Sequence, residues 1–90
     1  MTPRDELVRE LQDLEAEYRF WLVEAIAIER GIDDMEEQVD QHEHELGPER
    51  AADFRLRLAR TRERHQSTDE RIRYVRSRLD ELQKRLDEMP

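Results

Sequence analysis

The sequence contains no cysteine, only two glycines and three prolines, and few aromatic residues. Without cysteine the chain can form no disulfide and carry out no thiol chemistry. No stretch approaches the ~20 apolar residues needed to cross a bilayer, and the N-terminus lacks the basic and then apolar pattern of a signal peptide. We therefore expect a soluble, cytoplasmic protein.

Charged side chains, by contrast, make up 44% of the residues, and apolar ones only 36%. That is too little apolar material for a thick globular core, but enough for helices that each bury one stripe. The net charge of −8 argues against nucleic acid as a partner. Residues 1–48 carry 4 basic and 15 acidic side chains, whereas residues 49–90 carry 12 basic and 9 acidic ones. Halves of such different charge are expected to pair with each other.

Apolar residues recur along both halves in steps that alternate between three and four. The first series is Leu7, Leu11, Leu14, Tyr18, Trp21, Ala25, Ile28, Ile32, Met35, Val39, His42 and Leu46. The second is Ala51, Phe54, Leu58, Thr61, His65, Thr68, Ile72, Val75, Leu79, Leu82, Leu86 and Met89. A period of 3.5 is typical of the core seam of a coiled-coil helix, and a disordered chain would not maintain it.

Helix boundaries follow from local signals. Residues 2–5 read Thr-Pro-Arg-Asp, which combines a capping residue, proline in the first turn and the acidic residue of a capping box. Gly47 and Pro48 separate the two seams, and so short a connection forces antiparallel neighbours. We predict one all-α domain over residues 1–90, an antiparallel coiled-coil helical hairpin with helices over about 3–46 and 49–88 and a turn at 47–48.

Charges beside the seams predict how the helices face each other. With Leu11 and Ala51 at position a of their heptads, g faces g and e faces e. The predicted g pairs are Glu10–Arg85, Glu17–Arg78, Glu24–Arg71, Gln38–Arg57 and Glu45–Arg50, and the predicted e pairs are Glu36–Arg62 and Glu43–Arg55. Six of the seven are oppositely charged, which favours one register over others. Glu29 facing Asp69 is a like-charged exception.

The middle of the hairpin is its weakest part. Thr61, His65 and Thr68 are three consecutive polar seam positions, and Gly31 lies near them. These four residues are candidates for a hinge or for a device that fixes the register. Tolerated slack and a partner site remain as alternatives.

The three histidines invite a metal interpretation. Imidazole and carboxylate groups bind zinc, nickel or copper, and residues 41–45 read Gln-His-Glu-His-Glu. Side chains two apart on a helix do not face each other, however. We expect no metal and no cofactor in a single chain. A site that combines His42, His44 and His65 would require the symmetry of an oligomer.

Acidic residues surround the turn, namely Asp40, Glu43, Glu45, Glu49 and Asp53. In outline this tip resembles the coiled-coil fingers of Gre-type and DksA-type transcription factors. The resemblance is architectural, and it implies that an acidic tip could enter a channel of RNA polymerase. Those proteins also carry a globular domain that has no counterpart in these 90 residues.

Apolar residues go all round the helix over residues 20–28, more than one seam can bury. The surplus forms a second stripe, and exposed stripes of this kind mark interfaces. The predicted interface residues are Ala16, Phe20, Leu22, Val23, Ile26 and Ala27, with Tyr74 from the second helix. A membrane surface is the rival partner, but the surrounding acidic residues would be repelled by anionic lipid. We expect a homodimer that forms a four-helix bundle.

Motifs for catalysis are absent from the sequence, which has no glycine-rich phosphate loop and no nucleophile elbow. We therefore expect a non-enzymatic protein–protein interaction or scaffold module that acts as a homo-oligomeric helical hairpin and also binds an unidentified protein. The alternative is a regulator that docks its acidic tip or central apolar patch on a larger machine such as RNA polymerase.

Overall fold

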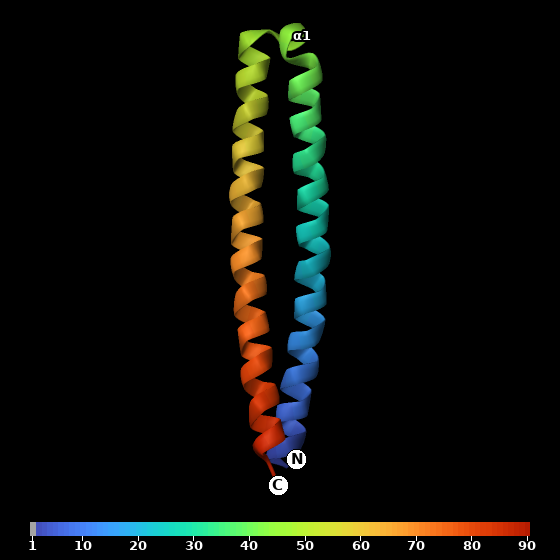
Figure 1. The fold of residues 1–90 in the computed structure, drawn as a ribbon, viewed down its shortest axis with the longest axis vertical. Coiled ribbons are helices and arrows are strands. Elements are labelled where there is room, and N and C mark those ends of the chain that lie inside the picture. Colours follow the sequence, from blue (N-terminus) through green and yellow to red (C-terminus); the bar gives the residue numbers. More distant parts are fainter. Residues whose placement is uncertain (1) are drawn as a thin grey trace.

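The computed structural model describes residues 2–90, with the side chain of Glu43 outside the described part. These residues form one long helical element, α1, with bounds Pro3–Glu88. Gly47 is non-helical, and the chain reverses direction there, so that α1 consists of two antiparallel halves (Figure 1). We call residues 3–46 arm 1 and residues 48–88 arm 2. The predicted all-α helical hairpin is confirmed.

The reversal depends on one glycine. Gly47 has φ 75° and ψ 165°, a conformation that side chains with a Cβ atom rarely adopt. Pro48 follows inside α1, at the start of arm 2, where its missing N–H costs no helical hydrogen bond. At the other end, the Thr2 hydroxyl accepts a bond of 3.2 Å from the Asp5 N–H, and the Asp5 carboxylate accepts one of 3.4 Å from the Thr2 N–H. The predicted capping box is thus present.

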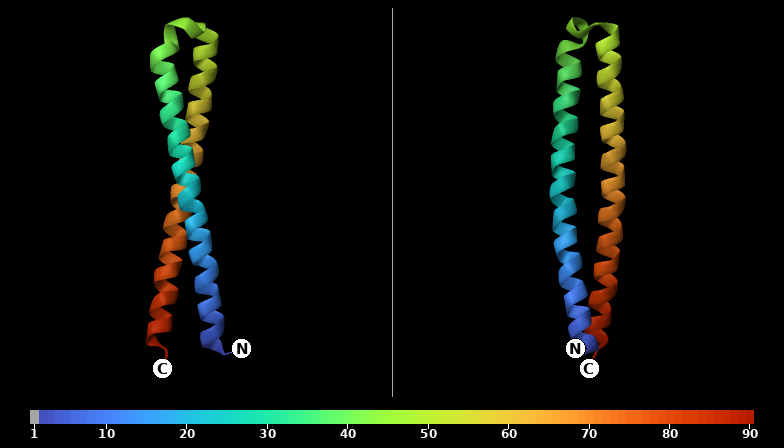
Figure 2. Two further views of the ribbon diagram at one scale, coloured as in Figure 1. Left: turned by 90° about the vertical axis from the view of Figure 1, so that its right-hand side faces the viewer. Right: turned by 180° about the vertical axis from the view of Figure 1, so that it is seen from behind.

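The hairpin is a rod of 66 × 17 × 14 Å. Both termini lie together at the end opposite the turn (Figure 1). Figure 2 shows the arms side by side in one view and crossing in the other, so they wrap around each other as coiled-coil helices do. α1 also continues through Gly31 and Ser67 without interruption, as the unbroken seams predict.

The two seams meet along the rod and bury each other. All their residues are buried or half-buried except His42, which is exposed. Val75 and Leu82 are completely covered. Near the termini, Leu7, Leu11 and Leu82 form a cluster of buried apolar residues, and partly buried leucines of both arms pack against it. The burial of one continuous stripe on each arm holds the hairpin together and leaves the outer faces of both arms open to solvent.

Candidate protein-interaction surface

Glutamates of arm 1 pair with arginines of arm 2 along one flank of the rod. The observed ion pairs are Glu10–Arg78 at 3.3 Å, Glu17–Arg71 at 2.5 Å and Glu24–Arg64 at 3.9 Å. Each glutamate contacts the arginine one heptad nearer to the turn than predicted, so the predicted pairs Glu10–Arg85, Glu17–Arg78 and Glu24–Arg71 are wrong. Arm 2 carries arginine at every g position. A shift of seven residues therefore preserves the attraction at each of these three glutamates, and charge complementarity there cannot choose between the two arrangements.

The observed pairs advance by seven residues on each arm toward the turn. The next two arginines of arm 2 in this series face positions of arm 1 that carry no charge. Arg57 then corresponds to Gly31, and Arg50 to Gln38. Neither arginine makes an ion pair within the part of the chain that the structure describes. The predicted pairs Glu45–Arg50 and Gln38–Arg57 are therefore also wrong, and Glu45 instead contacts His42 at 3.1 Å.

The opposite flank agrees better with the sequence. Arg62 donates a hydrogen bond of 2.5 Å to Glu36, which confirms that predicted e pair. The pair Glu43–Arg55 lies outside the described residues, because the side chain of Glu43 does.

The polar middle of the rod satisfies its own hydrogen bonds. Thr68 is buried, and its hydroxyl donates to the Arg64 carbonyl at 2.9 Å. The Thr61 hydroxyl donates in the same way to the Arg57 carbonyl at 2.8 Å. Such bonds to the preceding turn satisfy the hydroxyl of a threonine in the seam, and the Thr61 hydroxyl also contacts the Met35 sulfur on arm 1 at 4.0 Å. No buried side-chain nitrogen or oxygen lacks a partner among the described residues.

His65 explains how Glu29 and Asp69 tolerate each other. Its Nε2 atom lies 3.0 Å from a Glu29 oxygen on arm 1, and its Nδ1 atom lies 3.6 Å from an Asp69 oxygen on its own arm. The imidazole thus stands between the two carboxylates. The predicted direct opposition of Glu29 and Asp69 overlooked this seam residue, which links the arms at the centre of the rod.

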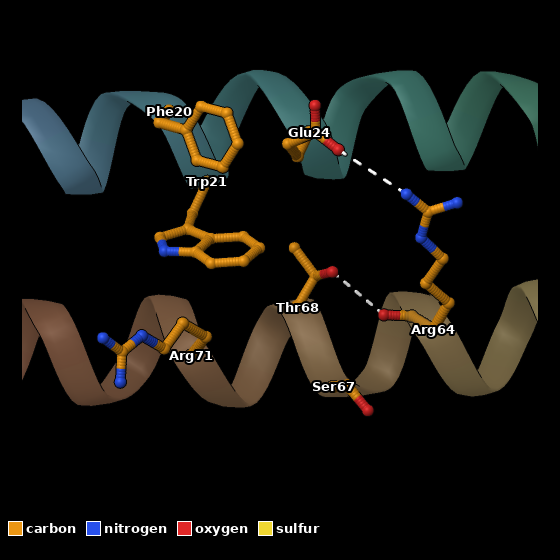
Figure 3. A pocket seen from close by; sticks show the side chains of 7 residues that line it. All are labelled: Phe20, Trp21, Glu24, Arg64, Ser67, Thr68 and Arg71. Carbon is orange, nitrogen blue, oxygen red and sulfur yellow. Dashed lines mark hydrogen bonds and ion pairs between the residues drawn. The ribbon is translucent and has the colours of Figure 1, made fainter.

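An aromatic pair lines a groove of about 500 Å³ between the arms, next to this centre (Figure 3). Phe20 and Trp21 meet edge to face, with ring centroids 5.1 Å apart. Trp21 points from arm 1 toward arm 2, where Thr68 and Arg71 complete the wall, while the Ser67 hydroxyl points away (Figure 3). Phe20 thereby belongs both to this groove and to the second apolar stripe of arm 1 that the sequence predicted.

Glu17 binds two residues that line this groove, Trp21 and Arg71. One of its oxygens accepts bonds from Arg71 Nε at 3.0 Å and from Trp21 Nε1 at 3.2 Å. The hydrogen bond from Arg71 is the main reason why the pKa of Glu17 lies below its ordinary value, and the bond from Trp21 lowers it further. The Arg71 guanidinium also lies 5.1 Å from the centre of the Tyr74 ring, within range for a cation–π contact. These contacts therefore fix the positions of the Trp21 and Arg71 side chains.

The predicted interface residues are all exposed. The exposed fraction is 55% for Phe20, 66% for Val23, 50% for Ile26 and 37% for Leu22, and Ala16 and Ala27 are exposed beside them. We call these six residues of arm 1 the apolar surface. Tyr74, which is 59% exposed, lies on arm 2 beside Arg71, on the side of the rod that carries the Glu17–Arg71 pair.

Sequence reasoning missed one exposed apolar side chain. Leu56 is 51% exposed on arm 2, in the half of the rod nearest the turn. It stands between two arginines at heptad position f, which points away from the other arm. An apolar residue at such a position was the signal in the sequence that could have revealed it. It is separate from the apolar surface.

The tip carries both signs of charge. A groove of about 300 Å³ near the turn is lined by Leu46, Arg50, Asp53, Phe54 and Arg57. Of the acidic residues predicted around the turn, Asp53 thus shares this groove with Arg50 and Arg57, two arginines that make no ion pair within the described part of the chain.

The histidines are far from forming one site. His42 bonds to Glu45, His65 lies between its two carboxylates, and His44 belongs to the exposed residues. Across the described residues, no three histidine or carboxylate side chains converge as the ligands of a metal ion would. Both nitrogens of His65 already face a carboxylate, an arrangement that suits a bridge between the arms.

The chain matches no family model, no curated protein and no solved structure. Its function therefore has to be argued from its own surface. In the described part of the chain, no helix is both long and apolar enough to cross a membrane. What the geometry offers is contact area: a continuous apolar surface on arm 1 that ends at an aromatic groove whose charged walls are already paired.

Proposed function

We propose that this chain is a non-enzymatic protein–protein interaction module that acts as a homo-oligomeric helical hairpin. The observation that carries the proposal is the apolar surface, which groups Phe20, Leu22, Val23 and Ile26 on a rod otherwise covered with charge. Contiguous exposed apolar patches on small proteins mark contact sites. A second copy of the chain is the partner that brings an identical apolar surface. We further propose a cytoplasmic location, on the sequence grounds given above.

The exposed fractions set the strength of this association. Burying a Phe, Leu, Ile or Val side chain completely gains roughly 1.5–3 kcal/mol. These four side chains are between 37% and 66% exposed, so only about half of that gain remains. Two copies bury up to eight such side chains, which gives at most on the order of 6–12 kcal/mol. The cost of association is about 4–15 kcal/mol. The largest gain against the smallest cost leaves a net gain of about 8 kcal/mol, which corresponds to a micromolar dissociation constant, so we expect a micromolar dimer and not a nanomolar one.

Sedimentation equilibrium at micromolar concentrations tests the proposal. The wild type should sediment with twice the mass of the 11.0 kDa chain. Phe20→Glu combined with Val23→Glu should give the monomer, because two carboxylates in each copy would be buried without partners. Leu56→Glu is the matched control, since it places the same charge on a comparably exposed apolar residue elsewhere on the rod, and it should remain dimeric.

Two results would contradict this. A wild type that sediments as a monomer would exclude self-association at these concentrations. A double variant that remains dimeric would move the interface away from the apolar surface. A monomeric wild type would favour the second candidate function, in which the acidic tip or the same apolar surface docks on a larger machine such as RNA polymerase.

A further inference from the structure

The outer face of arm 1 carries a second series with the same alternating steps as the seam. It lies at heptad positions c and f, away from arm 2, and every member is exposed. We call it the outer row: Glu6, Arg9, Asp13, Ala16, Phe20, Val23, Ala27, Arg30, Asp34 and Glu37. Apolar residues occupy its centre and charged residues both ends. A row with this period can pack against another helix as a seam does.

The charges that flank the apolar centre have no partners of their own. Arg9 and Asp13 lie on its N-terminal side, and Arg30 and Asp34 on its C-terminal side. None of the four takes part in an ion pair or side-chain hydrogen bond within the described residues, although Glu15 and Arg19 on the neighbouring face do pair. On each side of its apolar centre, the outer row therefore presents one cation and one anion that make no ion pair within the described chain.

We propose that two copies of the chain pair antiparallel along their outer rows, with the two-fold axis level with the peptide between Trp21 and Leu22. This rests on the proposed self-association and specifies its register. The facing levels are Phe20 with the partner's Val23, Ala16 with the partner's Ala27, Asp13 with the partner's Arg30 and Arg9 with the partner's Asp34. The symmetry repeats each level, so all four charged residues of each copy gain an opposite charge.

Other registers lose this agreement. A shift of one heptad in one direction places Phe20 against Arg30 and Ala16 against Asp34. A shift in the other direction places Val23 against Asp13. A parallel arrangement brings each charged residue against its own copy. In the proposed register the one like-charged level is Glu6 with the partner's Glu37, at the ends of the row, where water and salt screen the repulsion.

The position of the outer row also sets the shape of the assembly. It lies opposite the seam on arm 1, so the two copies of arm 1 form the centre and each arm 2 lies outside. The level of Ala16 with the partner's Ala27, which the symmetry repeats, allows the central helices to approach closely, because the interaxial distance depends on the size of the side chains in contact. The four helices then form a layer rather than a square bundle.

Charge reversal across the proposed dimer tests the register. Arg30→Asp should weaken dimerisation about tenfold, because two symmetry-related attractions become repulsions. Adding Asp13→Arg to the same chain should restore the dissociation constant to near the wild-type value. The control exchanges Glu15 and Arg19, a pair within one arm at 3.9 Å on the adjacent face, and should leave dimerisation unchanged. Circular dichroism verifies that each variant remains helical.

The outcomes separate the register from the proposed function. If the wild type dimerises but the double exchange stays as weak as Arg30→Asp, or if Arg30→Asp has no effect, the register is wrong while self-association stands. If only the control exchange weakens the dimer, the interface runs along the face of Leu22 and Ile26, which also overturns the register. A wild type without a dimer overturns both proposals.

Discussion

Replacing each of the two glycines by alanine should change the stability of the hairpin in opposite directions. Gly31 lies inside arm 1, and a Cβ atom there would meet no heavy atom within 4 Å. Gly47 forms the reversal, and a Cβ atom there would also meet nothing within 4 Å. Steric space is therefore equal at the two sites, and the two substitutions isolate the effect of backbone conformation.

The magnitudes follow from that conformation. Gly31→Ala should raise the free energy of unfolding by about 1 kcal/mol, the difference between alanine and glycine in a helix interior. In a domain of this size that corresponds to a rise in Tm of about 4–8 °C. Gly47→Ala should lower the free energy of unfolding by roughly 1–3 kcal/mol, because it forces alanine to φ 75°.

Thermal and urea unfolding followed by circular dichroism measure both changes. All samples need the same protein concentration, since self-association makes Tm depend on concentration. A neutral or destabilising Gly31→Ala would refute the continuous arm 1 and indicate that a break at residue 31 is needed. The same variant examines the hinge hypothesis for Gly31, which requires that the added rigidity impair partner binding even though the hairpin becomes more stable.

Two further predictions concern Glu17. Glu17→Arg should lower the Tm of the hairpin. Adding Arg71→Glu to the same chain should recover part of that loss, whereas adding Arg78→Glu should not. Equal recovery of Tm by both would refute the observed pairing. Because its pKa is lowered in the fold, Glu17 contributes stability that is fully present above the pKa of the unfolded chain, about 4.3, and is lost as the pH falls through the lower folded value. Urea unfolding should therefore show a shallower loss of stability on acidification in Glu17→Gln than in the wild type; identical slopes would contradict this.

The burial pattern of the fold could be predicted from the sequence because it depends on a local property. A seam residue is buried whatever it faces, so spacing alone identifies Leu82 and Val75 as core. His42 is the exception. Its ring stays exposed and bonds to Glu45, which avoids the cost of desolvating the imidazole in the seam. Spacing also predicted that the residues of the apolar surface are exposed, because they do not occupy seam positions.

Pairing between the arms could not be predicted in the same way. The g positions of arm 2 are all arginine, and exchanging one arginine for the next leaves the predicted attractions of Glu10, Glu17 and Glu24 intact. The role of His65 was missed for a related reason, because a comparison of e positions alone left out the seam residue between Glu29 and Asp69. Contacts between flanking positions depend on the three-dimensional path of long side chains, which spacing does not determine.

The heptad period makes this fold easy to predict, but it also repeats the same residue types at equivalent positions, so that alternative pairings between helices look alike. Information about register therefore lies where the repeat is interrupted. Gly31 and Gln38 end the glutamate row of arm 1 and leave Arg57 and Arg50 without ion pairs in the described chain. In the outer row the interruption is the change from charged to apolar residues around Phe20 and Val23, and it distinguishes one antiparallel alignment from those shifted by seven. Exposed residues that break a repeat therefore constrain partners more strongly than those that continue it.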